Sequence, residues 1–317
     1  MRGWKVNIEK LTTLSKMKIT FLRIMHIALL TGWISSERSV ALRSAENLEK
    51  WIGLAGYTST SFDLPHDLWK FLENYKQYDF IVPMFHGTYG EDGQITAFLG
   101  TLGCKYASSD FSVHALCMNK YHTNLVIETI GICIPETIFL KKWESIDTDI
   151  LSYPRFIKPN QWGSSVSNFI VKNPEECQYA INSITADDIL IQSLIPGREF
   201  TVWVYKDRDW IHILPMVEIC PKNEFFDFEE KYNTDGSNEV FKDLPENIQK
   251  PLEEMSSKIY DFLDCRWVVR IDWRYDGENI YFLEVNTIPG FTSGSLVPKM
   301  WRNAGKNEKE FIEMLLY

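Results

Sequence analysis

The residues best suited to chemistry lie in one stretch near the C-terminal end of this 317-residue chain. It spans residues 270–296 and has the sequence RIDWRYDGENIYFLEVNTIPGFTSGSL. Two runs rich in β-branched and aromatic residues, 268–274 and 280–286, flank an Asp-Gly pair at 276–277. Because such a pair favours a tight turn, the stretch is predicted to begin with a β-hairpin.

Side chains alternate between the two faces of a strand, and this predicts which residues of the hairpin meet. One face is predicted to carry Arg270, Asp272, Arg274, Phe282, Glu284 and Asn286. The opposite face carries residues apolar enough to be buried, namely Val269, Ile271, Trp273, Tyr281, Leu283 and Val285.

The polar face would place Asp272 beside Glu284, with Asn286 beyond them. Like charges directly opposed destabilise a sheet, so a positive group is expected between them. Three hard oxygen ligands without Cys or His suit Mg²⁺ better than zinc. Mg²⁺ held in this way usually also coordinates substrate phosphates, and Arg270 could hold a developing anion. The carboxylates alone are equally compatible with a solvated acidic face.

The residues that follow decide between these alternatives. The order R-x-D, E-x-N-T-x-P-G-x-T-x-x-S-L-x-P resembles the C-terminal signature of the D-alanine–D-alanine ligases, which belong to the ATP-grasp superfamily. The resemblance implies ATP and Mg²⁺ (or Mn²⁺), with two ions, as cofactors, and Asp272, Glu284 and Asn286 as metal ligands. It implies that Arg270 stabilises the transferred phosphoryl group and the tetrahedral intermediate. It also implies that the second D-amino acid is lined by Gly290, Ser295 and Leu296.

Length and composition limit the number of domains, the class of protein and its possible partners. A chain of this size is expected to form two or three compact units. Its hydrophobic fraction of 45% and charged fraction of 24% are typical of a soluble globular protein. A net charge of −10 argues against nucleic acid or an anionic membrane as the main partner.

The cysteines and the N-terminal residues indicate where the protein works. The six cysteines form no C-x-x-C pair, which favours reduced thiols over a disulfide framework or a zinc site. No apolar run approaches membrane-spanning length. The segment 16–30 has basic residues before apolar ones but no cleavage site, so we expect a cytoplasmic protein with residues 1–24 as an extension.

Residues 26–52 are predicted to be the start of an α/β domain. A buried strand is predicted at 26–30, then a helix capped by Ser35 or Ser36. The buried stripe of that helix is predicted to hold Leu42, Ala45, Leu48 and Ile52. The family has G-G-x-S-x-E-R-x-V-S-L here, with Thr31 and Ala41 as departures in this chain. The resemblance implies that Glu37 binds the ammonium group of the first D-alanine; the alternative is an acid that favours the helix dipole.

A second strand, 80–85, leads into the octet HGTYGEDG. Its three glycines allow the backbone to approach a ligand closely. The chain has neither G-K-[ST] nor G-x-G-x-x-G, which excludes a P-loop and a dinucleotide fingerprint. The octet resembles the family's H-G-x-x-G-E-D-G and implies that His86 lies at the substrate site, although a lone His at a strand end is often structural. Glu91 is expected to hold the loop together.

Two further stretches resemble the family's phosphate-binding segments. A unit is predicted to open at 108–118, with Asp110 as helix cap, and A-L-C-M-N-K resembles A-L-x-M-D-K, which implies that Lys120 reaches an ATP phosphate. The run FIKPNQWGSSVS resembles K-P-x-x-x-G-S-S-V-G as far as Ser167, where glycine is usual. It implies phosphate contacts from Lys158, Gly163 and Ser165. It also implies that Ser164 positions the first substrate.

Residues 188–201 are predicted to form a strand, a linker and a strand. ATP-grasp enzymes bind adenine against such a linker, largely through backbone groups. The implied nucleotide contacts are Gln192 and Ser193, where the family has Glu-Lys, then Leu194 and Ile195 beside the base and Glu199 on the ribose.

Residues 225–232 resemble the family's loop F-Y-D-Y-x-x-K-Y, which closes over the site. The resemblance implies that Lys231 approaches the γ-phosphate. It also implies that Tyr232 completes a hydrogen-bonded trio with Glu37 and Ser164. A tyrosine here favours D-alanine over D-lactate as second substrate.

The expected fold is α/β (mixed α+β), a three-domain ATP-grasp fold with an N-terminal Rossmann-like domain. The predicted domains are 25–108, 109–193 and 194–317, and the last helix is predicted from Asn307. The implied reaction is ATP-driven joining of two D-alanines through D-alanyl phosphate, for peptidoglycan precursors, by a homodimer. The alternatives are a D-serine or D-lactate ligase and a relative that has lost catalysis; an NAD-dependent dehydrogenase lacks its glycine fingerprint.

Overall fold

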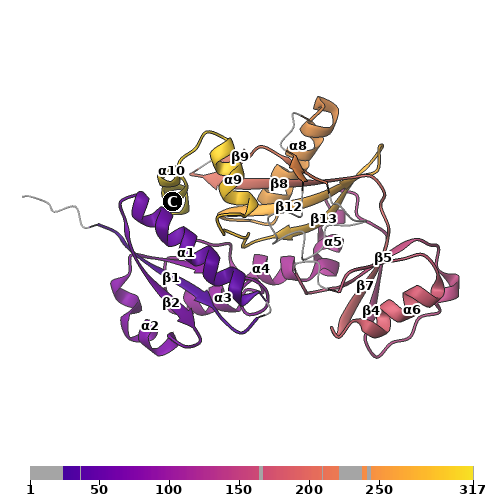
Figure 1. Ribbon diagram of the computed structural model, residues 1–317, viewed down its shortest axis with the longest axis horizontal. Helices are drawn as coiled ribbons and strands as arrows, with labels where there is room; N and C mark the ends of the chain where they lie inside the picture. The colour runs from indigo at the N-terminus through magenta and orange to yellow at the C-terminus, as the bar shows by residue number, and fades with distance from the viewer. Residues whose placement is uncertain are drawn as a thin grey trace, which may run out of the picture.

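A computed structural model of the protein describes residues 24–35, 37–163, 167–208, 210–220, 238–240 and 244–316, with the backbone alone for 238–240. Within these ranges the chain forms three β-sheets with helices packed against them. Figure 1 shows the sheets side by side, with the sheet of the C-terminal part between the other two. The predicted α/β fold class is therefore confirmed.

The N-terminal sheet is parallel, with strand order β2-β1-β3. Its strands are β1 (His26–Gly32), β2 (Thr58–Leu64) and β3 (Phe80–Met84), and its helices are α1 (Arg38–Leu54), α2 (Leu68–Asn74), the short η3 (Tyr75–Gln77) and α3 (Gln94–Thr101). Parallel strands need crossover connections that cover both sheet faces. Ile27 and Leu29 accordingly belong to one hydrophobic cluster, and Ala28 and Leu30 to another.

Helix α1 begins differently from the prediction. Its N-cap is Glu37 and not a serine, and Ser36 lies outside the described residues. The Ser35 hydroxyl accepts a hydrogen bond from the Glu37 N–H (3.3 Å) and donates to the His86 carbonyl (2.9 Å). Leu42 is only half-buried, because the buried stripe follows Ala41, Ser44, Ala45, Leu48 and Ile52.

The central sheet is antiparallel, with order β4-β7-β5-β6. It consists of β4 (Thr137–Lys141), β5 (Arg155–Pro159), β6 (Phe169–Val171) and β7 (Asp188–Ser193), with η4 (Thr148–Ile150) and α6 (Pro174–Ser183). Ile157, Ile189 and Ile191 pack against Cys177 and Ala180 of α6, and these contacts form the core of this part.

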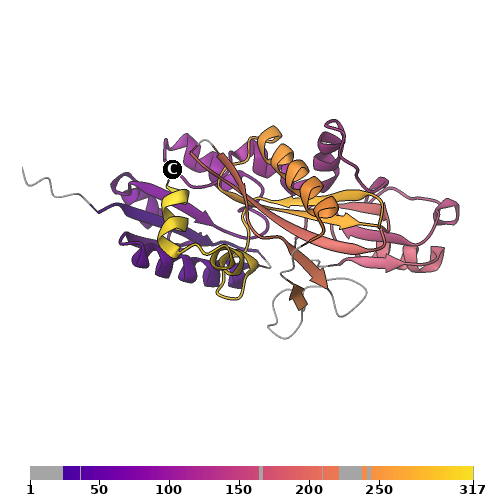
Figure 2. The same ribbon diagram turned by 90° about the horizontal axis from the view of Figure 1, so that it is seen from above.

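The largest sheet has the order β11-β10-β8-β12-β13, with β9 paired to β8, and all its pairings are antiparallel. Its strands are β8 (Arg198–Asp207), β9 (Trp210–Ile213), β10 (Val217–Cys220), β11 (Asn238–Val240), β12 (Val268–Tyr275) and β13 (Ile280–Asn286). Helix α8 (Glu246–Phe262) lies along this sheet (Figure 2). Helices α4 (Phe111–Met118) and α5 (Lys120–Glu128) share its hydrophobic core.

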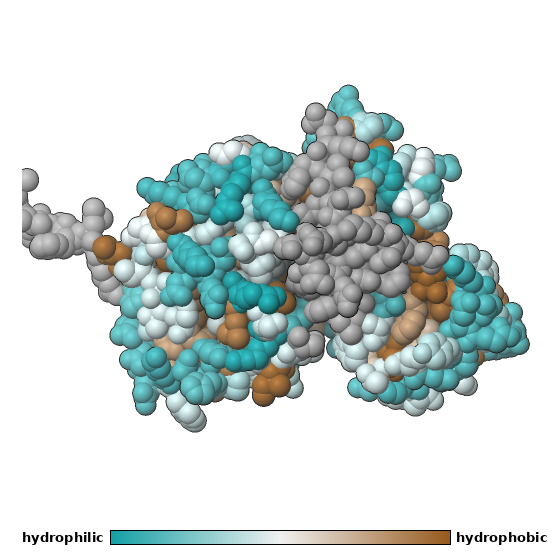
Figure 3. Space-filling view, viewed as in Figure 1, coloured by the Kyte–Doolittle hydropathy of each residue, from teal (hydrophilic) through white to brown (hydrophobic). Residues whose placement is uncertain are grey.

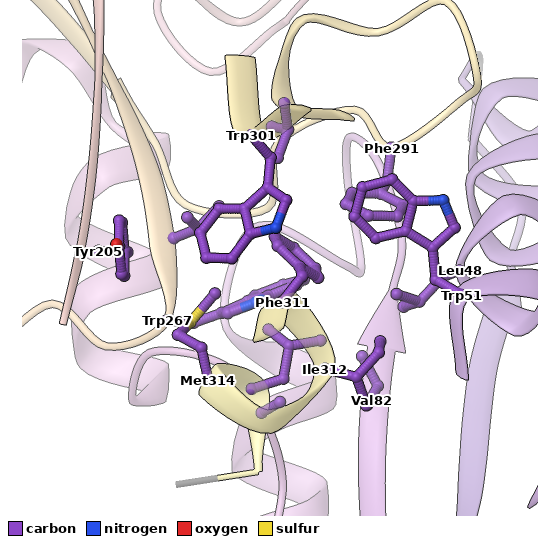
Figure 4. Close-up of a cluster of buried hydrophobic side chains, with 14 of the residues drawn as sticks. Leu48, Trp51, Val82, Tyr205, Trp267, Phe291, Trp301, Phe311, Ile312 and Met314 are labelled. Carbon is purple, nitrogen blue, oxygen red and sulfur yellow. The ribbon is translucent and has the colours of Figure 1, made fainter. Parts of the chain in front are cut away.

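The two last helices, α9 (Leu296–Asn303) and α10 (Glu308–Leu315), join the N-terminal part to the largest sheet. Figure 4 shows their aromatic side chains between α1 and that sheet. The Trp51 ring packs edge-on against Phe291 (4.8 Å between centroids) and Phe311 (5.3 Å), and Phe311 packs against Trp301 (5.1 Å). The predicted helix after Asn307 is confirmed, with a capping box at that residue.

On the face seen in Figure 3, hydrophobic residues lie scattered among hydrophilic ones over the described part of the chain. None of the helices in the described ranges has both the length and the apolar character needed to cross a bilayer.

Candidate active site

The predicted hairpin is confirmed as β12 and β13, and it brings the predicted charged residues together. Asp272 lies opposite Glu284, and Arg270 lies opposite Asn286. A positive group lies between the carboxylates, as expected: Arg270 Nη2 is 3.0 Å from Asp272 Oδ2 and 3.5 Å from Glu284 Oε1. Lys120 Nζ approaches Glu284 Oε2 at 3.6 Å from the other side.

The predicted face of Phe282 is wrong because a β-bulge interrupts the hairpin. The register shifts after Asp272, so Trp273 pairs with Phe282 and Leu283 is left over. One extra residue reverses the alternation of the strand beyond it. Phe282 is therefore buried in the core beside Trp273, with 5.9 Å between ring centroids, while Tyr281 and Leu283 are only half-buried.

Strand β8 supports the functional face of β12 residue by residue. Glu199 Oε2 accepts from Arg274 Nη1 (2.9 Å), and the Thr201 hydroxyl donates to Asp272 Oδ1 (2.9 Å). The Trp203 ring lies opposite Arg270, 5.9 Å from the guanidinium carbon. Thr201 and Trp203 were not predicted, although continuing the strand alternation from Glu199 would have found both.

The side-chain oxygens of Asp272, Glu284 and Asn286 fit a hard divalent cation. Asn286 Oδ1 is buried and has no hydrogen-bond partner among the residues that the structure describes. An orphaned buried acceptor is costly unless something positive binds it. This set contains only two carboxylates, and the same ranges contain no group of three or more His, Cys, Asp or Glu side chains that could hold a metal. Two carboxylates and one amide suit Mg²⁺, which is usually completed by water and substrate phosphates.

Glu37 faces this cluster from the N-terminal part. Glu37 is 7% exposed. Its carboxylate lies against Gly87, which follows β3, and Gly163, which lies between β5 and β6. A Cβ on Gly87 would come within 3.0 Å of Glu37 Oε2, and one on Gly163 within 3.2 Å. Both contacts would be tighter than usual for a Cβ, so the two glycines let the backbone come close to the carboxylate, and Gly87 also has a positive φ of 77°.

His86 belongs to a buried polar group behind Glu37. Its Nε2 lies 3.1 Å from the Ser44 hydroxyl, and its Nδ1 lies 4.0 Å from Glu91 Oε1. Burial raises the pKa of the Glu91 carboxyl, and the nearby His86 ring partly offsets this rise, while the Glu37 carboxylate adds to it. Glu91 Oε2 accepts from the Gly87 N–H (2.8 Å), which confirms that Glu91 holds the loop together.

The segment after β13 is anchored to α1. Ser44 Oγ accepts from the Phe291 N–H (3.1 Å), and the Asn47 amide donates to the Phe291 carbonyl (2.9 Å). Ser295 precedes α9, and its hydroxyl accepts from the Thr292 N–H (3.0 Å). These contacts fix the residues predicted to line the second amino acid relative to the N-terminal part.

Lys120 is held at the junction between the central and C-terminal sheets. Its Nζ donates to the Trp162 carbonyl (2.7 Å), and its backbone N–H donates to the Asn160 carbonyl (3.3 Å). The side chain is 8% exposed and faces Glu284. Asp110 caps α4 by accepting from the Ser112 N–H, as predicted.

One cleft joins most of the predicted residues that the structure describes. Its walls include Glu37, His86, Lys120, Gly163, Glu199, Arg270, Asp272, Glu284, Asn286, Gly290, Ser295 and Leu296. Lys158 is buried on β5 and is not among the described residues that line it; its Nζ lies 5.9 Å from the centre of the Phe156 ring. The remaining predicted residues, Ser164, Ser165, Lys231 and Tyr232, lie outside the described residues.

A second, mainly apolar cleft lies beside the linker after β7. It is lined by Tyr153, Pro154, Ile170, Lys172, Leu194, Ile195, Pro196 and Arg274. Arg274 connects the two clefts, because its Nε donates to the Ile195 carbonyl (3.0 Å) while its Nη1 binds Glu199.

The side chains of Gln192 and Ser193 are engaged elsewhere and line neither of these two clefts. The Gln192 amide donates to the Thr137 hydroxyl (2.8 Å). The Ser193 hydroxyl donates to Glu136 Oε2 (2.9 Å) and accepts from Arg155 Nη1 (3.1 Å). Both side chains therefore support the central sheet.

Comparison with known proteins agrees with this geometry. Residues 126–317 match the family model described as D-ala D-ala ligase C-terminus. This chain belongs to the D-alanine–D-alanine ligase family. Within the family it is 34% identical over 296 residues to the D-alanine–D-alanine ligase of Thermotoga petrophila, covering 92% of this chain and 96% of that one. It is also 34% identical over 310 residues to the ligase of Phocaeicola vulgatus, covering 90% and 96%.

A solved family structure has the same architecture. The ligase of Bacillus anthracis complexed with ATP superposes with a TM-score of 0.80 at 27% identity, covering 92% of this chain and 96% of that one. The D-alanyl-alanine synthetase A of Vibrio cholerae, at 23% identity and a TM-score of 0.77, shares the fold. The predicted ATP-grasp fold is thus confirmed.

Proposed function

We propose that this protein is an ATP-dependent ligase that joins two D-alanines into D-alanyl-D-alanine, releasing ADP and phosphate, for peptidoglycan precursor synthesis. Its family supports this activity. The observation that carries the proposal is the single cleft in which Glu37 faces Arg270, Lys120 and the Asp272–Glu284 pair. One side can hold an ammonium group, while the other can hold anionic oxygens.

The chemistry follows from the charges. The carboxylate of the first D-alanine attacks the γ-phosphorus of ATP, and ADP leaves. The amine of the second D-alanine then attacks the acyl phosphate, and phosphate leaves as the amine gives up a proton. Both steps concentrate negative charge, which the fixed cations Arg270 and Lys120 stabilise without reorganisation.

The metal ligands in this proposal are Asp272, Glu284 and Asn286. A divalent ion, Mg²⁺ or Mn²⁺, would supply charge neutralisation of the phosphates at this place, and we propose two such ions. The hairpin register supports this assignment by placing the two carboxylates side by side, with the orphaned Asn286 oxygen next to them.

The nucleotide is proposed to span the two clefts. Its base would lie against Leu194 and Ile195, and its ribose against Glu199, which is tied to the base cleft through Arg274. The side chains of Gln192 and Ser193 are taken up by the central sheet, and the Ser193 N–H donates to the Glu136 carbonyl (2.9 Å), so the proposed base contacts fall mainly on Leu194 and Ile195. The phosphate contacts proposed are Lys120, Lys158, Gly163, Ser165 and Lys231.

The amino acids would occupy the opposite end of the cleft. We assign the first D-alanine to Glu37, with Ser164 and Tyr232 as its partners, and the second to His86, Gly290, Ser295 and Leu296. The anchoring of Phe291 to α1 supports the second assignment, because it holds Gly290 and Ser295 close to His86 through Ser44.

The larger organisation is also part of the proposal. We place domain boundaries near residues 108 and 193; the second lies where the chain passes from β7 to β8 and so from one sheet to the next. We propose a cytoplasmic homodimer that acts on small molecules and binds neither nucleic acid nor membrane. Sedimentation equilibrium of the purified protein tests the dimer.

The decisive experiment is phosphate release from ATP and Mg²⁺ with D-alanine, with the product identified by mass. D-alanyl-D-alanine is the expected product. D-serine and D-lactate, offered together with D-alanine, serve as competing acceptors. A protein that releases phosphate only with one of these acceptors, or not at all with D-alanine, would contradict the proposal.

A further inference from the structure

A buried histidine outside the site contacts the end of the metal-binding strand. His114 lies on α4 with no exposed surface. Its Nδ1 is 2.6 Å from the Thr287 hydroxyl, and its Nε2 is 2.7 Å from the Ser108 hydroxyl. Thr287 directly follows Asn286 and lines the cleft, so the imidazole reaches the active site through one side chain.

The surroundings of His114 argue for a specific role. Its neighbours Val113 and Cys117 on α4 belong to the apolar core. Burying an imidazole there is costly unless both nitrogens are hydrogen-bonded, and both are. Burial lowers the pKa of His114 to about 4, so the ring is neutral and has one donor and one acceptor to place.

The contact fixes the point at which the chain leaves the sheet. Asn286 is the last residue of β13, and its Oδ1 has no hydrogen-bond partner in the described ranges that could orient it. Its side-chain direction therefore depends on the backbone around it. Thr287 is held there by His114 from a helix that packs on β13. Such supporting contacts commonly tune a ligand without touching the metal.

We propose that His114 is a positioning residue: through Thr287 it fixes the end of β13 and thereby aims Asn286 at the divalent cation. This inference rests on the proposed function, since it concerns the metal ligands of that site. His114 touches neither substrate nor metal. It acts through the Thr287 hydroxyl, whereas the contact with Ser108 holds the ring itself.

Two substitutions separate these contacts. In His114→Asn the amide lies where Nδ1 was, so it keeps Thr287 and gives up Ser108. In His114→Gln the amide reaches the place of Nε2, so it keeps Ser108 and gives up Thr287. Both remove a ring from the same core site, so both should lower the unfolding temperature. Only His114→Gln should disturb Asn286.

The readouts are turnover and, independently, Mn²⁺ binding to the ADP complex measured by electron paramagnetic resonance. His114→Gln should lower turnover and Mn²⁺ affinity about tenfold, whereas His114→Asn should keep both close to the wild-type values. Equal losses in the two variants would overturn the proposal and leave His114 a packing residue. Thr287→Val, which removes the hydroxyl at nearly constant shape, should reproduce the His114→Gln losses even if a histidine variant fails to fold; wild-type Mn²⁺ binding in Thr287→Val would also overturn it.

The double variant His114→Gln/Thr287→Val provides the final check. If the two residues act as one unit, its Mn²⁺ affinity equals that of the weaker single variant; additive losses would contradict the coupling. Because the Mn²⁺ measurement needs no turnover, it tests His114 separately from the ligase activity. A wild-type protein that binds Mn²⁺ but releases no phosphate with D-alanine would refute the proposed function alone.

Discussion

The two sides of the cleft are built on different principles. On the hairpin side, each charged side chain has a partner directly across the sheet: Asp272 has Glu284 on one strand and Thr201 on the other. On the Glu37 side, no strand pairing places the carboxylate. It lies at the start of α1, and two glycines allow the backbone to come close to it.

This difference predicts how each side responds to change. Many hydrogen bonds fix the register of a sheet. One substitution on the hairpin therefore removes the function of that side chain without moving the adjacent residues. A close backbone approach depends on the absence of a Cβ, so one methyl group displaces the residue opposite. The hairpin side should therefore fail through lost charge, and the Glu37 side through lost geometry.

Arg270→Ala should give the largest effect. The guanidinium contacts both carboxylates, and in the proposed function it stabilises the negative charge that develops in both steps. Removing one such stabilising group typically lowers kcat by roughly 10²- to 10³-fold. Initial rates of phosphate release should show this loss with the KM for ATP largely unchanged. Arg270→Lys, which keeps the charge, should recover part of it, and exposed Arg266→Ala serves as the control; near-normal turnover in Arg270→Ala would remove Arg270 from the mechanism.

A pH effect on stability should follow from His114, which supports the hairpin side. Burial lowers its folded-state pKa to about 4, against an ordinary value of about 6.5. Between these values the unfolded chain binds the proton and the folded protein does not, so stability falls as pH falls. The loss at pH 4 is about 3 kcal/mol of unfolding free energy relative to pH 7. Urea titrations at several pH values should show this loss of unfolding free energy in wild type and not in His114→Asn.

Glu284→Gln tests the metal ligands. It keeps the shape of the side chain and removes its charge from the hairpin. Because loss of a supporting contact already costs about tenfold in metal affinity, loss of a direct ligand should raise the half-saturating Mg²⁺ concentration by at least about tenfold. The measurement is initial rate against Mg²⁺ concentration. Glu278→Gln, in the exposed turn of the same hairpin, is the matched control, and identical Mg²⁺ curves for the two variants would exclude Glu284 as a ligand.

The same contrast explains how much could be predicted. Strand alternation predicts the pairing of Asp272 with Glu284 because it depends only on local periodicity. The bulge at Leu283 leaves no local signal, so Phe282 was assigned to the wrong face. Glu37 and His86 were found only through the family resemblance, since the loops that position them have no periodicity.

Long-range partners mark the limit of prediction. His114 is a lone histidine on an apolar helix, and its partner Thr287 lies 173 residues further along the chain. Gln192 was assigned to the nucleotide, but its amide binds Thr137, 55 residues earlier. In both cases the fold, and not the neighbouring residues, chooses the hydrogen-bond partner.

Gly163→Ala should have the smallest effect and tests the geometry of the Glu37 side. The added Cβ would lie 3.2 Å from Glu37 Oε2, so the carboxylate must shift by a few tenths of an ångström. Since a displacement of about 1 Å can cost 10²-fold, this shift should raise the KM for the first D-alanine by about fivefold, without changing the Mg²⁺ dependence. Gly53→Ala, on the exposed face of α1 with no atom within 4 Å of the new Cβ, is the control and should leave KM unchanged. A rise in the Mg²⁺ requirement of Gly163→Ala, with KM unchanged, would show instead that both sides of the cleft move as one body.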